Sequence, residues 1–167
     1  MSDTPLNESP IEPENPRRFG ERIRKLAGLF DNRQEMRVAL LIVFLLAAWL
    51  RFPDLATRGT FDGDQGTDAL VVRTMIRDGI VPLLGPRTSI GAFHHGAPYY
   101  YLLCPAGIPS GGNDPIALAA LIAVLGVAAV GVTWWLARSI SGSAAGVVAG
   151  LLLAASATAV EASTFIW

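Results

Sequence analysis

Three carboxylates stand close together in residues 61–68, Phe-Asp-Gly-Asp-Gln-Gly-Thr-Asp. They belong to Asp62, Asp64 and Asp68. A carboxylate can take a proton from a hydroxyl nucleophile or coordinate a divalent cation. Charge is sparse beyond this cluster, because residues 88–167 hold only Asp114, Arg138 and Glu161 among Asp, Glu, Lys and Arg. A polar cluster beside long apolar segments indicates chemistry at a bilayer surface.

The Asp-x-Asp form of residues 62–64 places two possible oxygen ligands side by side. Asp62 and Asp64 are therefore candidate ligands of a divalent metal, and Asp68 or His95 would complete the set. The alternative for Asp62 and Asp68 is helix capping and solvation. Both roles stay open for the cluster.

The elements that must position this cluster are apolar helices, since 51% of the residues are hydrophobic and 16% are charged. Ile116–Ala137 and Ser139–Val160 are each 22 residues without a charge, long enough to cross about 30 Å of hydrocarbon. Val38–Leu50 has only 13 such residues, and we expect Arg37 and Arg51 to snorkel to the two interfaces. The fold class expected is all-α integral membrane, with spans at about 36–53, 115–138 and 143–161.

Basic residues set the orientation of these spans. Seven of the 13 Lys and Arg residues precede residue 38, and Arg138 borders the turn expected at Ser139–Ser143. The positive-inside rule therefore predicts a multi-pass protein of the cell membrane with a cytoplasmic amino terminus. We expect residues 1–35 to form a largely disordered, basic cytoplasmic tail and residues 36–167 to form the membrane domain, with an outer loop at 54–114.

The outer loop is expected to contain two short helices. Thr67–Asp78 is amphipathic, with Ala69, Val72 and Ile76 on one face and Gly79 as its stop signal. Glycines and prolines are expected to make 79–96 irregular. An interfacial or partly inserted helix is expected to begin at Pro98 and to be broken by Pro105, Pro109 and Gly111-Gly112. Tyr99 and Tyr100 belong either to an interfacial aromatic belt or to a substrate contact.

A series of short motifs carries a family resemblance. In chain order these are Leu50-Arg51-Phe52, Gly63-Asp64-Gln65-Gly66, Asp78-Gly79, Pro82-Leu83-Leu84-Gly85-Pro86, His94-His95-Gly96-Ala97-Pro98-Tyr99-Tyr100-Tyr101, Ala145-Gly146 and Phe165-Ile166-Trp167. Over residues 49–167 the chain resembles glycosyltransferase family 39, the relatives of protein O-mannosyltransferases in the GT-C superfamily. Asp64 falls on the family's leading aspartate, whereas Gln65 replaces the usual glutamate.

The resemblance implies transfer of a sugar from a polyprenyl phosphate donor to an acceptor outside the cytoplasm. Asp64 would be the catalytic base of an inverting displacement. Arginines bind phosphate well, and Arg87, Arg73 and Arg58 are the candidates. The residues expected to contact substrate are Arg87, His94, His95, Tyr99, Tyr100 and Glu161.

Membrane lipids and the lipid-linked donor are the expected partners, and no nucleic acid is expected. Family members have many more spans, so the resemblance implies that these 167 residues are an N-terminal piece, inactive alone. Two other classes remain open: a fragment of a transporter or flippase, and a non-catalytic membrane anchor. Neither the sugar nor the acceptor is specified by these residues.

The charge distribution predicts that Thr60 and Ser141 lie on opposite sides of the membrane. Single cysteines at these positions, in a Cys104→Ala background, should react with an impermeant maleimide from opposite sides. Reaction of both from one side would contradict the predicted topology.

Overall fold

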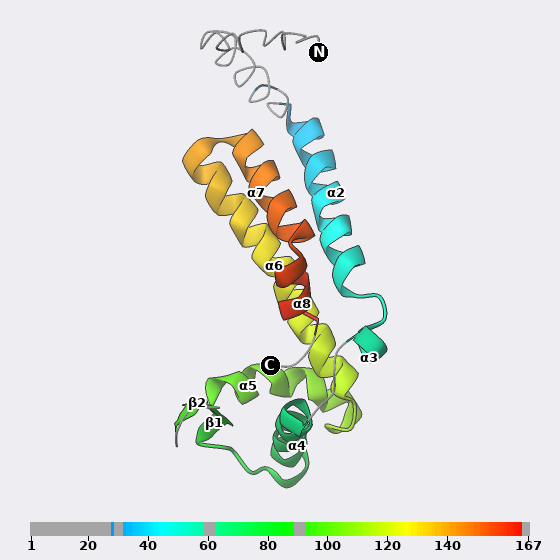
Figure 1. Cartoon of the computed structure of the whole chain (residues 1–167), viewed down its shortest axis with the longest axis vertical. Helices are drawn as coiled ribbons and strands as arrows, with labels where there is room; N and C mark the ends of the chain where they lie inside the picture. Colours follow the sequence, from blue (N-terminus) through cyan, green and yellow to red (C-terminus); the bar gives the residue numbers. More distant parts are fainter. Residues whose placement is uncertain (1–27, 29–31, 59–62, 89–92, 165–167) are drawn as a thin grey trace, which may run out of the picture.

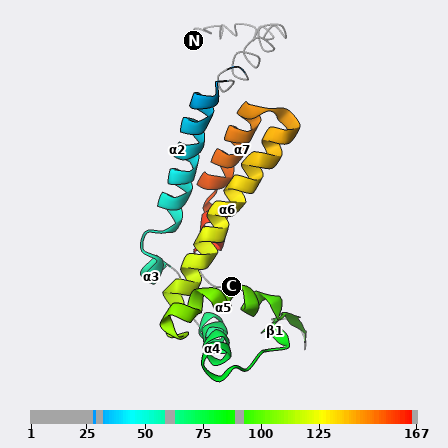
Figure 2. The same ribbon diagram turned by 180° about the vertical axis from the view of Figure 1, so that it is seen from behind.

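The computed structural model describes residues 28, 32–58, 63–88 and 93–164, and the chain is mostly helical. A bundle of three long helices stands on a smaller group of elements, here called the basal region (Figures 1 and 2). The bundle consists of α2 (Arg33–Arg51), α6 (Pro115–Ser141) and α7 (Ser143–Ala155). The basal region consists of α4 (Gly63–Asp78), β1 (Leu84–Arg87), β2 (His94–Gly96) and α5 (Pro98–Gly107). The short elements α3 (Leu55–Arg58), η1 (Ile108–Ser110) and α8 (Ala157–Ala162) complete the described fold.

Local capping explains where α2 and α6 begin. The Asn32 side chain accepts a hydrogen bond from the backbone N–H of Gln34 at 3.1 Å, at the start of α2. Asp114 accepts from the N–H of Ile116 at 2.9 Å, and Pro115 occupies the first position of α6. Both arrangements satisfy backbone donors that a helix start leaves without an intrahelical partner.

The turn between α6 and α7 is shorter than the sequence predicts. Helix α6 continues to Ser141, and α7 starts at Ser143. Gly142 alone makes the reversal, with a φ of 88° that favours glycine. The expected turn at Ser139–Ser143 is therefore reduced to one residue.

Small residues let the bundle helices approach closely. Its core contains Val43 and Ala47 of α2, Val130 of α6, and Val147 and Ala154 of α7. A Cβ added at Gly146 of α7 would lie 2.9 Å from the carbonyl oxygen of Trp134 in α6. Side chains larger than hydrogen would separate these two helices.

Helix α6 also contributes to a second core, which lies in the basal region. Leu118 is buried with Val72 of α4 and with Tyr100 and Leu103 of α5. Ala69 and Ile76 pack against the same cluster, so the predicted apolar face of α4 is confirmed. Gly79, with a φ of 68°, follows the last residue of α4 as expected.

Three details of the predicted basal region are corrected. Helix α4 starts at Gly63 rather than at Thr67. Helix α5 continues through Pro105 to Gly107, because a proline in the last turn removes only one helical hydrogen bond. The chain expected to be irregular contains an antiparallel pair of strands, with Leu84 opposite Gly96 and Arg87 opposite His94.

The mostly helical character of the predicted membrane fold is confirmed. Within the described ranges, α6 is long and apolar enough to cross a membrane, by length and composition, and α7 is a shorter apolar helix. Helix α2 carries charges near both ends, whereas α7 stops at Ala155 and α8 follows after Ser156. The third predicted span is thus a broken helix rather than a continuous one.

The expectation that Arg51 snorkels to an interface is wrong within this fold. Its side chain is 1% exposed and lies between the bundle helices. The guanidinium donates hydrogen bonds to atoms of α2, of α7 and of Ser163.

The close approach of the two strands gives a test of the hairpin. A Cβ at Gly85 would overlap the carbonyl group of Gly96, and neither backbone can move away without opening the pair. Gly85→Ala should therefore destabilise the hairpin by about 1–3 kcal/mol. Hydrogen exchange of the β1 and β2 amides should speed up accordingly.

Gly63→Ala is the matched control, because an added Cβ there meets no atom within 4 Å. It should leave exchange in the hairpin unchanged. Equal exchange rates in the Gly85→Ala variant and the parent chain would show that the strands are not paired as described.

Candidate functional site

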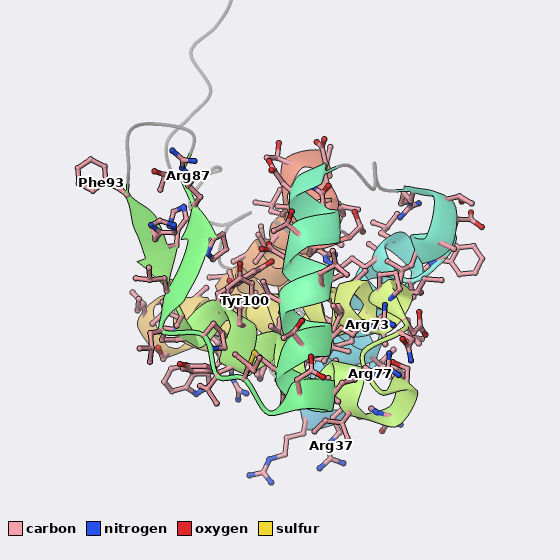
Figure 3. All side chains as sticks on the ribbon, turned by 90° about the horizontal axis from the view of Figure 1, so that it is seen from below. Arg37, Arg73, Arg77, Arg87, Phe93 and Tyr100 are labelled. Atoms are coloured by element: carbon pink, nitrogen blue, oxygen red, sulfur yellow. The ribbon has the colours of Figure 1, made fainter. Side chains whose placement is uncertain are left out.

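A pocket of about 810 Å³ lies between three walls of the basal region. Helix α4 supplies one wall, the hairpin a second and α5 the third (Figure 3). The residues that line it are Asp64, Thr67, Asp68, Pro86, Arg87, His95, Gly96, Tyr99 and Tyr100. The pocket therefore combines carboxylates, a guanidinium, an imidazole and two phenol rings.

Asp64 lies in the first turn of α4, and its side chain is exposed. The amino-terminal end of a helix carries a partial positive charge from aligned peptide dipoles, which stabilises a carboxylate there. The earlier start of α4 places Asp64 inside the helix rather than before it. The backbone thus fixes the direction in which this carboxylate leaves the helix.

Asp68 lies one helical turn after Asp64 and is held by Tyr100. The Tyr100 hydroxyl donates a hydrogen bond of 2.7 Å to Oδ1 of Asp68. Both side chains are only 3% exposed. This bond joins α4 to α5, and so it ties together two of the three walls of the pocket.

The surroundings raise the pKa of Asp68. Burial disfavours the charged carboxylate and is the largest cause, while the negative charge of Asp64 adds to it. The hydrogen bond from Tyr100 acts in the opposite direction, because it stabilises the ionised form. The pKa of the Tyr100 phenol is raised, first by burial and then by its bond to Asp68.

The hairpin brings Arg87 and His95 to the pocket from two strands. The side chain of Arg87 is exposed, and so is that of His95. Both stand at the pocket lining, whereas the cations Arg73 and Arg77 lie on the opposite side of α4 (Figure 3). Of these four described side chains, Arg87 and His95 are therefore the ones placed to meet a ligand in this pocket.

The structure brings together five of the predicted site residues. These are Asp64, Arg87, His95, Tyr99 and Tyr100. His94 is exposed on β2 and is not among the lining residues, and Glu161 is exposed on α8 at the bundle. Asp62 lies outside the described residues.

Four lining residues were not predicted to contact substrate: Thr67, Asp68, Pro86 and Gly96. A signal for Asp68 was present in the sequence, because it stands four residues before Val72 and so belongs to the buried face of α4. Its spacing from Asp64 also puts the two carboxylates on one side of the helix. A carboxylate on an apolar face needs a polar partner, which Tyr100 supplies.

A divalent metal finds no complete set of ligands among the described residues. No group of three or more His, Cys, Asp or Glu side chains in the described ranges is arranged to hold one. The predicted ligand pair includes Asp62, so that prediction is not tested by this part of the chain.

Comparisons with known proteins give no match. The chain matches no protein-family model, no curated protein and no solved structure. The interpretation of the pocket therefore depends on its own chemistry.

The bond between Tyr100 and Asp68 predicts a further rise in the pKa of Asp68 in Tyr100→Phe. The variant loses the donor that stabilises the ionised carboxylate, while the burial that raises the pKa remains. Carbon-13 NMR of labelled aspartate carboxyls would follow the titration. Tyr101→Phe is the control, since Tyr101 donates to the carbonyl of Pro82 and leaves Asp68 untouched.

The same titration predicts a sign for stability against pH. Because the pKa of Asp68 is raised on folding, its favourable contribution is complete below the unfolded pKa and is lost as pH rises through the folded pKa. Asp68→Asn is neutral throughout, so the parent chain should lose stability relative to this variant over that window. If the difference in unfolding free energy between the parent chain and Asp68→Asn does not change with pH, the pKa of Asp68 is not raised on folding.

Proposed function

We propose that the chain takes part in transferring a sugar from a polyprenyl phosphate donor to a hydroxyl acceptor on the extracytoplasmic side of a membrane. The observation that supports this proposal is the gathering of Asp64, Arg87, His95 and Tyr99 around one pocket beside a bundle of apolar helices. The pocket holds a possible base, possible ligands for a phosphate and a ring for a sugar.

The reaction needs a base and an anion site more than it needs an acid. The acceptor hydroxyl gives its proton to Asp64 while its oxygen forms a bond to the anomeric carbon. The bond from that carbon to the phosphate oxygen breaks, and its electron pair leaves with the phosphate. A single displacement of this kind inverts the configuration at the anomeric carbon.

Arg87 and His95 are suited to the phosphate that leaves. A guanidinium offers parallel N–H donors that match two phosphate oxygens. Both side chains are exposed at the pocket, so a donor can reach them without rearrangement of the core. Their position on the hairpin, across from α4, separates the phosphate from the base.

Tyr99 and Tyr100 have different parts in this arrangement. Tyr100 is buried and its hydroxyl is bonded to Asp68, so it holds α4 and α5 in register. Tyr99 is partly exposed at the lining, and its ring packs at a centroid distance of 5.6 Å from that of Tyr100. Tyr99 is therefore the ring placed to contact a sugar.

The proposal places the bundle in the membrane and the basal region outside the cytoplasm. Helices α2, α6 and the α7–α8 pair would be the three crossings. Large apolar side chains are exposed along α2, where lipid would cover them: Val38, Leu41, Ile42, Leu45 and Trp49. Arg138, whose guanidinium lies 5.3 Å from the Trp134 ring, would mark the cytoplasmic end of α6.

The base assignment is tested with Asp64→Asn. The substitution keeps the size of the side chain but removes the proton acceptor, so transfer from a polyprenyl phosphate sugar should fall by roughly 10² to 10⁴. The assay uses membranes of cells that produce the whole gene product carrying this chain. Unchanged turnover in a variant that inserts normally would overturn the proposal.

The phosphate assignment predicts weaker donor binding in Arg87→Gln. Binding of polyprenyl phosphate in lipid nanodiscs would be measured for this variant, for Asp64→Asn and for Arg77→Gln. Arg77→Gln is the matched control because it removes an arginine from the far side of α4. Binding should fall only for Arg87→Gln, and equal binding by all three variants would exclude a phosphate site at the hairpin.

A further inference from the structure

The break between α7 and α8 leaves backbone carbonyl groups that need hydrogen-bond donors. Helix α7 ends at Ala155, Ser156 is extended with a ψ of 117°, and α8 begins at Ala157. A helix end leaves its last four carbonyl groups without intrahelical hydrogen bonds. Within an apolar bundle such groups are costly unless another donor reaches them.

Arg51 of α2 reaches two of these carbonyls. Its Nη1 donates to the Ala154 carbonyl at 3.1 Å, and its Nη2 donates to the Leu153 carbonyl at 3.3 Å. A further bond from Nη1, to the Ala47 carbonyl at 3.3 Å, anchors the guanidinium to its own helix. The forked head of one side chain thus bridges α2 and the end of α7.

The same side chain also binds the chain just beyond α8. Nε of Arg51 donates to the Ser163 hydroxyl at 2.9 Å. That hydroxyl also lies 2.6 Å from the Ala159 carbonyl, to which it donates. Ser163 therefore accepts from Arg51 and bonds back to α8, which connects the guanidinium to this short helix.

Helix α6 leaves just enough room for the contact between Arg51 and Ser163. A Cβ at Gly126 of α6 would lie 2.5 Å from Cβ of Ser163 and 3.0 Å from Nε of Arg51. Arg51, Ser163 and Gly126 therefore meet at one point, where α2, α6 and the chain after α8 converge.

The positive charge of Arg51 is stabilised by neutral groups, since its described partners include no carboxylate. Its hydrogen bonds go to three carbonyl groups and one hydroxyl. The carboxyl end of α7 carries the negative end of the helix dipole, which favours a cation there. Glu161, the acid nearest in sequence to Ser163, is exposed.

We infer that Arg51 is a positioning residue that holds the break between α7 and α8 and fixes α8 against α2 and α6. Three bonds from one rigid fork, two to α7 and one to Ser163, set the direction in which the chain leaves α7, while the fourth anchors the guanidinium to α2. Helix α8 lies at the end of the bundle that faces the basal region (Figure 1). Arg51 thereby sets how the chain after α7 approaches the region that contains the pocket.

The inference predicts a local effect when Arg51 is replaced, and pairs of spin labels can detect it. One label at the exposed Trp49 of α2 is combined with a second label at Glu161 of α8 or at Leu152 of α7. Both pairs are made in a Cys104→Ala background in lipid nanodiscs. Arg51→Met should lose the narrow Trp49–Glu161 distance peak and keep the Trp49–Leu152 peak.

Arg51→Lys and Ser163→Ala make the test independent of whether Arg51→Met folds. An ammonium group lacks the planar fork, so Arg51→Lys should broaden the Trp49–Glu161 peak. Ser163→Ala removes one of the four bonds and should broaden it less. The inference is overturned if that peak stays narrow in both variants, or if the Trp49–Leu152 peak is lost together with it.

Discussion

The packing of α6 against two separate cores is the constraint on which the rest of this structure depends. Val130 is buried with α2 and α7, whereas Leu118, three turns earlier, is buried with α4 and α5. Burying a side chain of this size contributes about 1.5–3 kcal/mol. A single rigid helix therefore fixes the position of the basal region, and of its pocket, relative to the bundle.

Two buried polar contacts fix details that apolar packing leaves open. Hydrophobic contacts are not directional, but a hydrogen bond between buried groups requires one geometry. The bond between Tyr100 and Asp68 sets α4 against α5 at the pocket. Arg51 similarly sets the end of α7 and the chain after α8 against α2.

Under the proposed function, the Tyr100–Asp68 bond and the bonds of Arg51 affect different parts of the molecule. Asp68 and Tyr100 shape the wall that carries Asp64, so they act on the proposed base through its surroundings. Arg51 lies among the bundle helices and acts on the path of the chain, at a distance from the pocket. The polar groups that would meet a donor, Arg87 and His95, instead stand on an exposed hairpin.

Local signals in the sequence determined much of the architecture. Asp114 with Pro115 marks the start of α6, Gly79 marks the end of α4, and the spacing of Ala69, Val72 and Ile76 identifies its buried face. These features depend on residues within one or two helical turns, so they can be inferred from a linear pattern. The acidic cluster likewise identified Asp64, which lines the pocket.

Tertiary contacts decided the remainder. The hairpin depends on the approach of Gly85 to Gly96, and the bond from Tyr100 to Asp68 joins residues 32 apart. The predicted snorkelling of Arg51 was wrong because three of its four partner groups are distant in sequence: two carbonyls of α7 and the hydroxyl of Ser163, 112 residues away. His94 was predicted from its place in a motif and Glu161 as an acid at the outer end of the third predicted span, but their backbone places them away from the pocket lining. Sequence spacing determines the face of a helix, but only packing between distant segments determines what meets that face.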